Sequence, residues 1–232
     1  MADDRRMMTT TYAGLAQHRG RRRHVGDPID IDDYLREAGF TTGAALQRAR
    51  GVLEQRGLTN PRKQGFSREK RASVDAALAS LARACSGACA DLLRVRGDKR
   101  EIIRLTRAGC EVCNGSNNQR AVAECISALR RKKMRKIVIV GGSPGQRNDV
   151  RQYFEGAGVD IRFVDGTSAS HGAKEAERNK MWAQLIVIWG PTPLRHAVSN
   201  RYTEERYEGL KVVTVPRRGI EALCAEVVRA VG

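Results

Sequence analysis

Four cysteines form the clearest chemical pattern in the sequence. Three residues separate Cys85 from Cys89, two separate Cys110 from Cys113, and twenty residues lie between the pairs. Such spacing suits a four-cysteine zinc site, because each pair places two thiolates on one tight turn and the intervening segment brings the turns together. We therefore expect a zinc knuckle or ribbon over residues 85–115, with these four side chains as its ligands.

A purely structural interpretation of the first pair is also open. Cys85 continues an apolar stripe with helical spacing that begins at Val74, so it could instead end a helix that runs to about Ala84. Against this, Gly87 and Gly115 stand where tight ligand turns favour glycine, and the second pair lies in a stretch rich in Gly, Asn and Ser. A zinc element of this size has almost no hydrophobic core, so the metal would supply its folding free energy.

The rest of the composition favours thiol ligation over disulfides. The N-terminus is polar and lacks the apolar centre of a signal peptide, and the longest apolar run, Leu185–Trp189, is far shorter than the roughly 20 residues of a membrane span. We therefore expect a cytoplasmic protein that makes no membrane contact and whose cysteines stay reduced. The other two cysteines, Cys125 and Cys224, lie on apolar faces of predicted helices and are expected in the core.

The charge of the chain is the second strong signal. Lys and Arg number 42 against 26 Asp and Glu, which gives a net charge of +16. A surplus of this size is typical of nucleic-acid-binding proteins. Two basic blocks stand out, a basic arm and the end of a predicted helix: Arg19, Arg21, Arg22 and Arg23; Arg130, Arg131, Lys132 and Lys133. The first block could be a solvated tail and the second could complement a helix dipole, but neither explains a surplus spread through the whole chain.

The N-terminal half divides into a basic arm and a helical part. Residues 1–27 carry little apolar periodicity and are expected to be flexible. Residues 28–84 predict three short helices with a Gly-containing turn between the first two, which suits a helix-turn-helix-like module whose second helix presents Arg48 and Arg50. Any small helical bundle would give the same pattern.

Residues 116–232 alternate between amphipathic and short apolar segments. Strands are predicted over 137–140, 161–164, 185–189 and 212–215, and helices over 117–132, 146–157, 173–183, 193–200 and 218–231. Apolar strands that alternate with amphipathic helices indicate a parallel sheet covered on both faces. We therefore expect an α/β protein with a four-stranded parallel Rossmann- or flavodoxin-like domain at its C-terminal end.

Ligands in such folds bind where the strands end at their carboxyl edge. The candidate residues follow three of the predicted strands: Gly141, Gly142, Ser143, Gly145 and Arg147; Asp165 and Thr167; Arg217 and Arg218. The first loop could hold a phosphate, and hence a nucleotide, on backbone N–H groups at a helix N-terminus. It matches neither the dinucleotide-binding fingerprint nor a P-loop, and any doubly wound fold needs a turn of this kind.

Few side chains suit catalysis. Asp165, His171, His196 and Ser199 are the only candidates for acid–base or nucleophilic work, and no nucleophile elbow, zinc-protease helix or paired carboxylates accompany them. We therefore favour a protein that is not an enzyme.

Several short motifs occur in a fixed order along the chain: Cys110-Glu-Val-Cys113-Asn-Gly-Ser-Asn-Asn118, Val140-Gly-Gly-Ser143, Val164-Asp-Gly-Thr167, Trp189-Gly-Pro-Thr192, His196-Ala-Val-Ser199 and Arg217-Arg-Gly219. Taken together, these motifs resemble bacterial proteins that carry an uncharacterised Rossmann-like domain of unknown function. The resemblance covers roughly residues 85–232. It implies a helical part, then a Cys-pair element, then the Rossmann-like domain, and it implies no substrate.

These observations favour a non-enzymatic zinc protein that binds nucleic acid, DNA more than RNA. In this hypothesis the α/β domain mediates self-association into a homo-oligomer or senses a ligand. One alternative is a nucleotide-binding sensor or enzyme that uses the Gly141–Gly145 loop. Another is a basic factor that docks on a large nucleoprotein assembly, such as the ribosome or a complex of a phage or mobile element.

Overall fold

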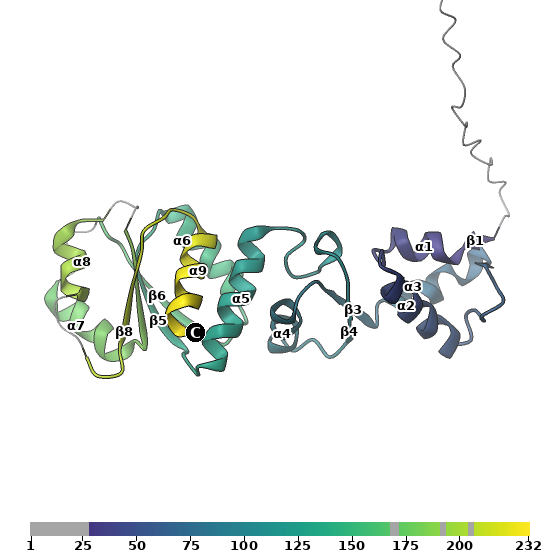
Figure 1. The fold of residues 1–232 in the computed structure, drawn as a ribbon, viewed down its shortest axis with the longest axis horizontal. Helices are drawn as coiled ribbons and strands as arrows, with labels where there is room; N and C mark the ends of the chain where they lie inside the picture. The colour runs from purple at the N-terminus through teal and green to yellow at the C-terminus, as the bar shows by residue number, and fades with distance from the viewer. Residues whose placement is uncertain (1–27, 168–171, 191–193, 204–206) are drawn as a thin grey trace, which may run out of the picture.

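The computed structural model describes residues 28–167, 172–190, 194–203 and 207–232. Helices α1 to α3 lie at one end of the molecule and the α/β domain at the other, with α4, β3 and β4 between them (Figure 1). The basic arm with Arg19, Arg21, Arg22 and Arg23 lies outside the described residues. In the described part of the chain, no helix has the length and apolar character needed to cross a membrane.

From residue 28 to the end of the helical part, the structure describes three α-helices: α1 (Ile31–Glu37), α2 (Gly43–Gln55) and α3 (Arg71–Leu78). The first two begin at side-chain caps, because Asp30 accepts the N–H of Asp33 and Thr42 accepts that of Ala45. Strand β1 (Ile29–Asp30) pairs with β2 (Gly65–Phe66), and the short 3-10 helix η1 (Arg68–Lys70) precedes α3. The helices enclose a core that includes Leu35, Phe40 and Leu53.

The cysteine-containing segment has a regular fold. Strand β3 (Leu81–Ala84), helix α4 (Gly87–Val95) and strand β4 (Glu101–Arg104) form a βαβ unit in which the two strands pair in parallel. The segment is therefore a βαβ unit and not the expected knuckle or ribbon, while its buried residues, such as Leu92 and Leu93 of α4, belong to cores that it shares with the neighbouring parts. The helix predicted to reach Ala84 ends at Leu78. The prediction is too long because the apolar residues of β3, a strand buried on both faces, continue the helical spacing by coincidence.

Nine elements lie in the described residues of the C-terminal domain: α5 (Asn117–Arg131), β5 (Lys136–Gly141), α6 (Pro144–Phe154), β6 (Asp160–Val164), α7 (Ala173–Trp182), β7 (Leu185–Trp189), α8 (His196–Thr203), β8 (Lys211–Val215) and α9 (Ile220–Val231). The strands form one parallel sheet in the order β6-β5-β7-β8. The predicted α/β class with a four-stranded parallel, Rossmann-like sheet is confirmed.

Helices cover both faces of this sheet, as the sequence predicts. Helices α5, α6 and α9 pack with Ile137 and Ile139 on one face, whereas α7 and α8 pack with Val138 and Val140 on the other. Figure 1 shows the same division, with α7 and α8 on the far side of the strands from α5 and α9. Cys125 and Cys224 are buried in the first of these cores, which confirms their expected structural role.

Candidate metal centre

The two strands of the βαβ unit deliver the four cysteines to one place. Cys85 directly follows β3 and Cys89 lies in the first turn of α4, while Cys110 and Cys113 follow β4 and the short 3-10 helix η2 (Arg107–Gly109). Because β3 and β4 are parallel, both cysteine pairs lie beyond the same carboxyl edge. The parallel pairing therefore joins ligands that are far apart in the sequence.

The distances between the sulfur atoms fit one metal ion. All four Sγ atoms lie within 4.8 Å of one another, with 3.8 Å from Cys85 to Cys89 and 3.5 Å from Cys85 to Cys113. A tetrahedral zinc ion with Zn–S bonds of about 2.3 Å separates its sulfurs by about 3.8 Å. A disulfide would need about 2.05 Å, and all four thiols are free. The spacing prediction is thus confirmed to the extent that these residues form a cluster that could hold a metal.

Local hydrogen bonds and turns shape the two ligand loops. The Ser86 side chain accepts the N–H of Cys89 at 3.2 Å and thereby caps α4. After Cys113 the backbone turns through Asn114 and Gly115, both with positive φ, which confirms the expected glycine turn at 115. Gly87 has no positive φ and simply begins α4, so the turn expected there is wrong.

The Cys110–Cys113 loop is also held by ion pairs. Glu111 lies between the two ligands in the sequence. It forms ion pairs with Arg83 of β3 at 3.0 Å and with Arg100 at 2.7 Å. The guanidinium of Arg83 also donates a hydrogen bond to the carbonyl oxygen of Ala38 in the helical part. The loop is therefore tied to β3 and to the N-terminal helices independently of any metal.

The thiols differ in how readily they lose a proton. Burial opposes ionisation of Cys110, but backbone N–H groups of Cys113, Cys85 and Val112 outweigh it and lower its pKa to about 7. Burial raises the pKa of Cys89 and of Cys113 above the usual value of a thiol. The metal-free cluster at neutral pH therefore carries protons that a metal must displace.

The cluster is a closed ligand set. Three of the cysteines are buried and Cys85 is partly exposed, and within the described ranges no histidine or carboxylate joins the four sulfurs. Four thiolate ligands satisfy tetrahedral zinc and leave no position for a substrate, as in structural rather than catalytic sites. The arrangement suits a metal that holds two chain segments together.

The predicted phosphate loop is present, but its own side chains use much of it. Gly141 and Gly142 have positive φ, and a Cβ on Gly142 would lie 2.9 Å from the Trp189 ring. Ser143 and Gln146 form a capping box that occupies the N–H groups of both residues, and Pro144 has none to offer. Few backbone N–H groups at this helix N-terminus are therefore left to bind a phosphate. The glycine at 142 is explained by packing, because a Cβ there would clash with the Trp189 ring.

The structure brings together three more of the predicted binding residues. Arg147 contacts Asp165 at 3.2 Å, and Asp165 accepts the backbone N–H and hydroxyl of Thr167 at 2.9 and 2.7 Å. The hydrogen bonds from Thr167, with Arg147 beside them, lower the pKa of Asp165 to about 2. Arg217 and Arg218 follow β8, which β7 separates from β5, and Gly145 lies in the first turn of α6.

The candidate acid–base residues do not form a catalytic arrangement. The Ser199 hydroxyl donates to the carbonyl oxygen of His196 at 3.1 Å, one turn earlier in α8, rather than to the His196 ring. Asp165 is held by Thr167 and Arg147, and His171 lies outside the described residues. The described candidates His196 and Ser199 are thus not arranged as a base with its nucleophile.

The predicted nucleic-acid-binding arginines of α2 are engaged within the protein. Arg48 donates to both carboxylate oxygens of Glu101 at 2.5 and 2.7 Å, and Arg50 lies 3.0 Å from Asp32 and 3.5 Å from Glu54. Sequence reasoning missed the Arg48 contact because Glu101 is 53 residues away and only the fold makes the two neighbours, whereas the four-residue spacing of Arg50 and Glu54 in α2 could have indicated their pairing.

The basic block at the end of α5 is exposed and free of carboxylates. Arg130 donates to the carbonyl oxygen of Ala157 and Arg131 to the hydroxyl of Ser127, while Lys132 and Lys133 are exposed in the turn that follows α5. None of these four side chains forms an ion pair with a carboxylate of the described residues. Their charge is therefore available to an anionic partner.

Comparison with protein families and curated sequences gives no further guide to this site. No protein family matches the chain, and no curated protein sequence matches it. The resemblance to bacterial proteins with a Rossmann-like domain of unknown function stays a prediction. The geometry of the site and the surface charge carry the functional argument.

Replacing one ligand should remove the metal without unfolding the α/β domain. We expect the purified protein to contain about one zinc ion per chain and Cys113→Ser to contain almost none, because three ligands bind zinc far more weakly than four. Elemental analysis measures the metal. Hydrogen exchange in Cys113→Ser should be faster than in the wild type in residues 81–113, with a smaller change in β5 and β7. The matched control is Cys125→Ala, which should keep the metal; metal loss in the control or full occupancy in Cys113→Ser would contradict the assignment.

Metal affinity should fall steeply as pH falls. The raised pKa values of Cys89 and Cys113 mean that both are protonated in the metal-free protein near pH 8, so binding releases at least two protons. Below pH 7 the thiolate of Cys110 is also lost, because its pKa is about 7. We expect the zinc affinity to drop at least about a hundredfold per pH unit near pH 8 and more steeply below pH 7. Competition with a chelator of known pH dependence measures this slope, and a slope below two protons would argue against these ligands.

Proposed function

We propose that this chain is a non-enzymatic nucleic-acid-binding protein in which structural zinc fixes the position of the helical part against the α/β domain. The observation that carries the proposal is the exposed block Arg130, Arg131, Lys132 and Lys133, which no carboxylate of the described residues neutralises, in a chain of net charge +16. Phosphate groups are the common partner for such a surface, since each contact releases counterions.

Zinc is the metal that the ligand set favours. Four cysteines at near-tetrahedral separations suit zinc, and soft thiolates disfavour calcium and magnesium. In a reducing cytoplasm, where we place the protein, these thiols remain available as ligands. The metal would bind to Cys85, Cys89, Cys110 and Cys113 and contribute folding free energy to the βαβ unit.

DNA is the preferred partner over RNA. The three N-terminal helices, with a Gly-containing turn between the first two, suit a helix-turn-helix-like module. Because Arg48 and Arg50 are paired with carboxylates, the proposal assigns the main phosphate contacts to the α5 block rather than to α2.

Two other functions have less support. A nucleotide sensor or enzyme would need the Gly141–Gly145 loop, whose helix N-terminus is largely occupied by its capping box. Docking on a ribosome or another nucleoprotein assembly would use the same basic surface, and co-purification of a specific RNA or protein would favour it.

Neutralising the α5 block should weaken binding and reduce its salt dependence. In fluorescence anisotropy with labelled duplex DNA and RNA, the quadruple variant Arg130→Ala, Arg131→Ala, Lys132→Ala and Lys133→Ala should lower the salt slope by about 3 to 4, because each lost phosphate contact removes about 0.9. The matched control is Arg48→Ala with Arg50→Ala, which should change the slope little.

The metal-replete fold of each variant is checked by circular dichroism before binding is measured. Wild-type binding that is absent or insensitive to salt would contradict the proposal. An unchanged salt slope in the quadruple variant would show that the phosphate contacts lie on another surface.

A further inference from the structure

Strand β6 offers a free edge for pairing. It lies at one end of the sheet, and in the described part of the chain β5 is its only strand partner. The N–H of Asp160 donates to the carbonyl oxygen of Arg135, the residue before β5, at 2.7 Å and therefore points toward β5. Because peptide groups alternate in direction along a strand, those of Ile161 and Phe163 point away from β5. Within the described residues, the edge therefore presents backbone donors and acceptors without a partner.

The side chains of β6 divide between the two faces of the sheet. Ile161 and Phe163 pack on the α6 side, where Arg151 stacks over the Phe163 ring at 4.7 Å. Arg162 points to the α7 side, where it stacks over Trp182 at 3.9 Å and reaches Asn179 at 3.4 Å. The edge thus carries apolar residues on one face and charged residues on the other.

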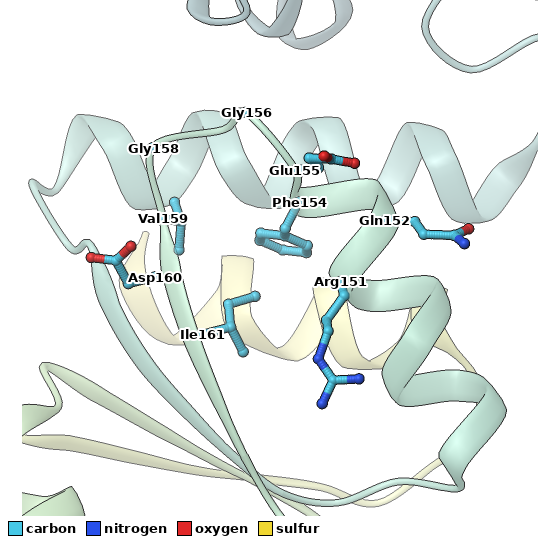
Figure 2. A pocket seen from close by; sticks show the side chains of 9 residues that line it. All are labelled: Arg151, Gln152, Phe154, Glu155, Gly156, Gly158, Val159, Asp160 and Ile161. Carbon is cyan, nitrogen blue, oxygen red and sulfur yellow. The ribbon is translucent and has the colours of Figure 1, made fainter.

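A groove of about 460 Å³ opens beside this edge, between α6 and β6. Figure 2 shows Val159 and Ile161 pointing from the strand toward Phe154 of α6, while Asp160 points to the opposite side of the strand. An incoming strand would therefore find apolar side chains next to the free backbone groups.

We propose that the β6 edge binds the same edge of a second copy of this chain, antiparallel, about a twofold axis at Ile161. In this register Ile161 faces Ile161 of the second copy, and Val159 faces its Phe163, so that residues with outward peptide groups exchange hydrogen bonds. The two four-stranded sheets join into one continuous sheet, and the grooves meet across the axis.

The charges of the strand select this register. It places Asp160 of each copy opposite Arg162 of the other, which gives two attractive pairs. Among the neighbouring registers with the same outward peptide groups, those centred on Asp160 or Arg162 set two like charges face to face, and the one centred on Phe163 places no opposite charges together. Charged residues on an edge strand usually prevent pairing, but here their signs alternate so that the edge is complementary to itself.

This inference goes beyond the proposed nucleic-acid binding and takes up the self-association of the α/β domain that we expect from the sequence. Nuclease-treated, zinc-loaded protein is tested by sedimentation equilibrium, so that bridging by nucleic acid cannot imitate a dimer. The wild type should be dimeric. Asp160→Arg should weaken dimerisation by about tenfold or more, because it turns two attractive pairs into two repulsive ones. The double variant Asp160→Arg with Arg162→Asp should recover the dimer.

The matched control is Thr214→Arg, which adds a positive charge at an exposed position of the opposite edge strand, β8, and should leave the dimer unchanged. A second variant, Ile161→Pro, removes an outward N–H that β5 does not use and should give a folded monomer. A monomeric wild type, or a charge-swapped double variant that stays monomeric while folded, would overturn the proposal. Either result would leave the anisotropy test of nucleic-acid binding unaffected.

Discussion

The parallel pairing of β3 with β4 is the contact on which the rest of the molecule depends. It places both cysteine pairs beyond one edge, and its two faces belong to different cores. Leu81 and Ile103 pack into the helical part, whereas Ala82 and Ala84 pack toward the α/β domain. A thin two-stranded wall therefore serves as the joint, and a metal at its end would fix the angle of that joint.

The sequence predicts the cysteine cluster and the four-stranded sheet because each rests on local patterns. Short cysteine pairs indicate ligand turns, and apolar strands between amphipathic helices indicate a covered parallel sheet. The βαβ unit is missed, since Leu81–Ala84 is buried on both faces and its apolar spacing imitates a helix. Helix α4 is missed because it is short and begins inside the first ligand pair.

Long-range contacts account for the remaining differences. The charge of Arg48 looks free in the sequence, but Glu101 neutralises it once β4 is placed beside α2. The Gly141–Gly142 turn looks like a phosphate loop, but its glycine at 142 is required by the Trp189 ring. In both cases the residue type is clear from the sequence, while its partner depends on the tertiary fold.

The shared wall also constrains the order in which the chain folds during synthesis. The core of the N-terminal helices includes Ile103 and Leu105, which lie beyond the last of those helices and beyond α4. Since chains emerge from the ribosome N-terminus first, the helices are exposed before the residues that complete their core are available. The core of the helical part is therefore complete only once β4 has been synthesised, so the helical part and the metal-binding unit overlap along the chain.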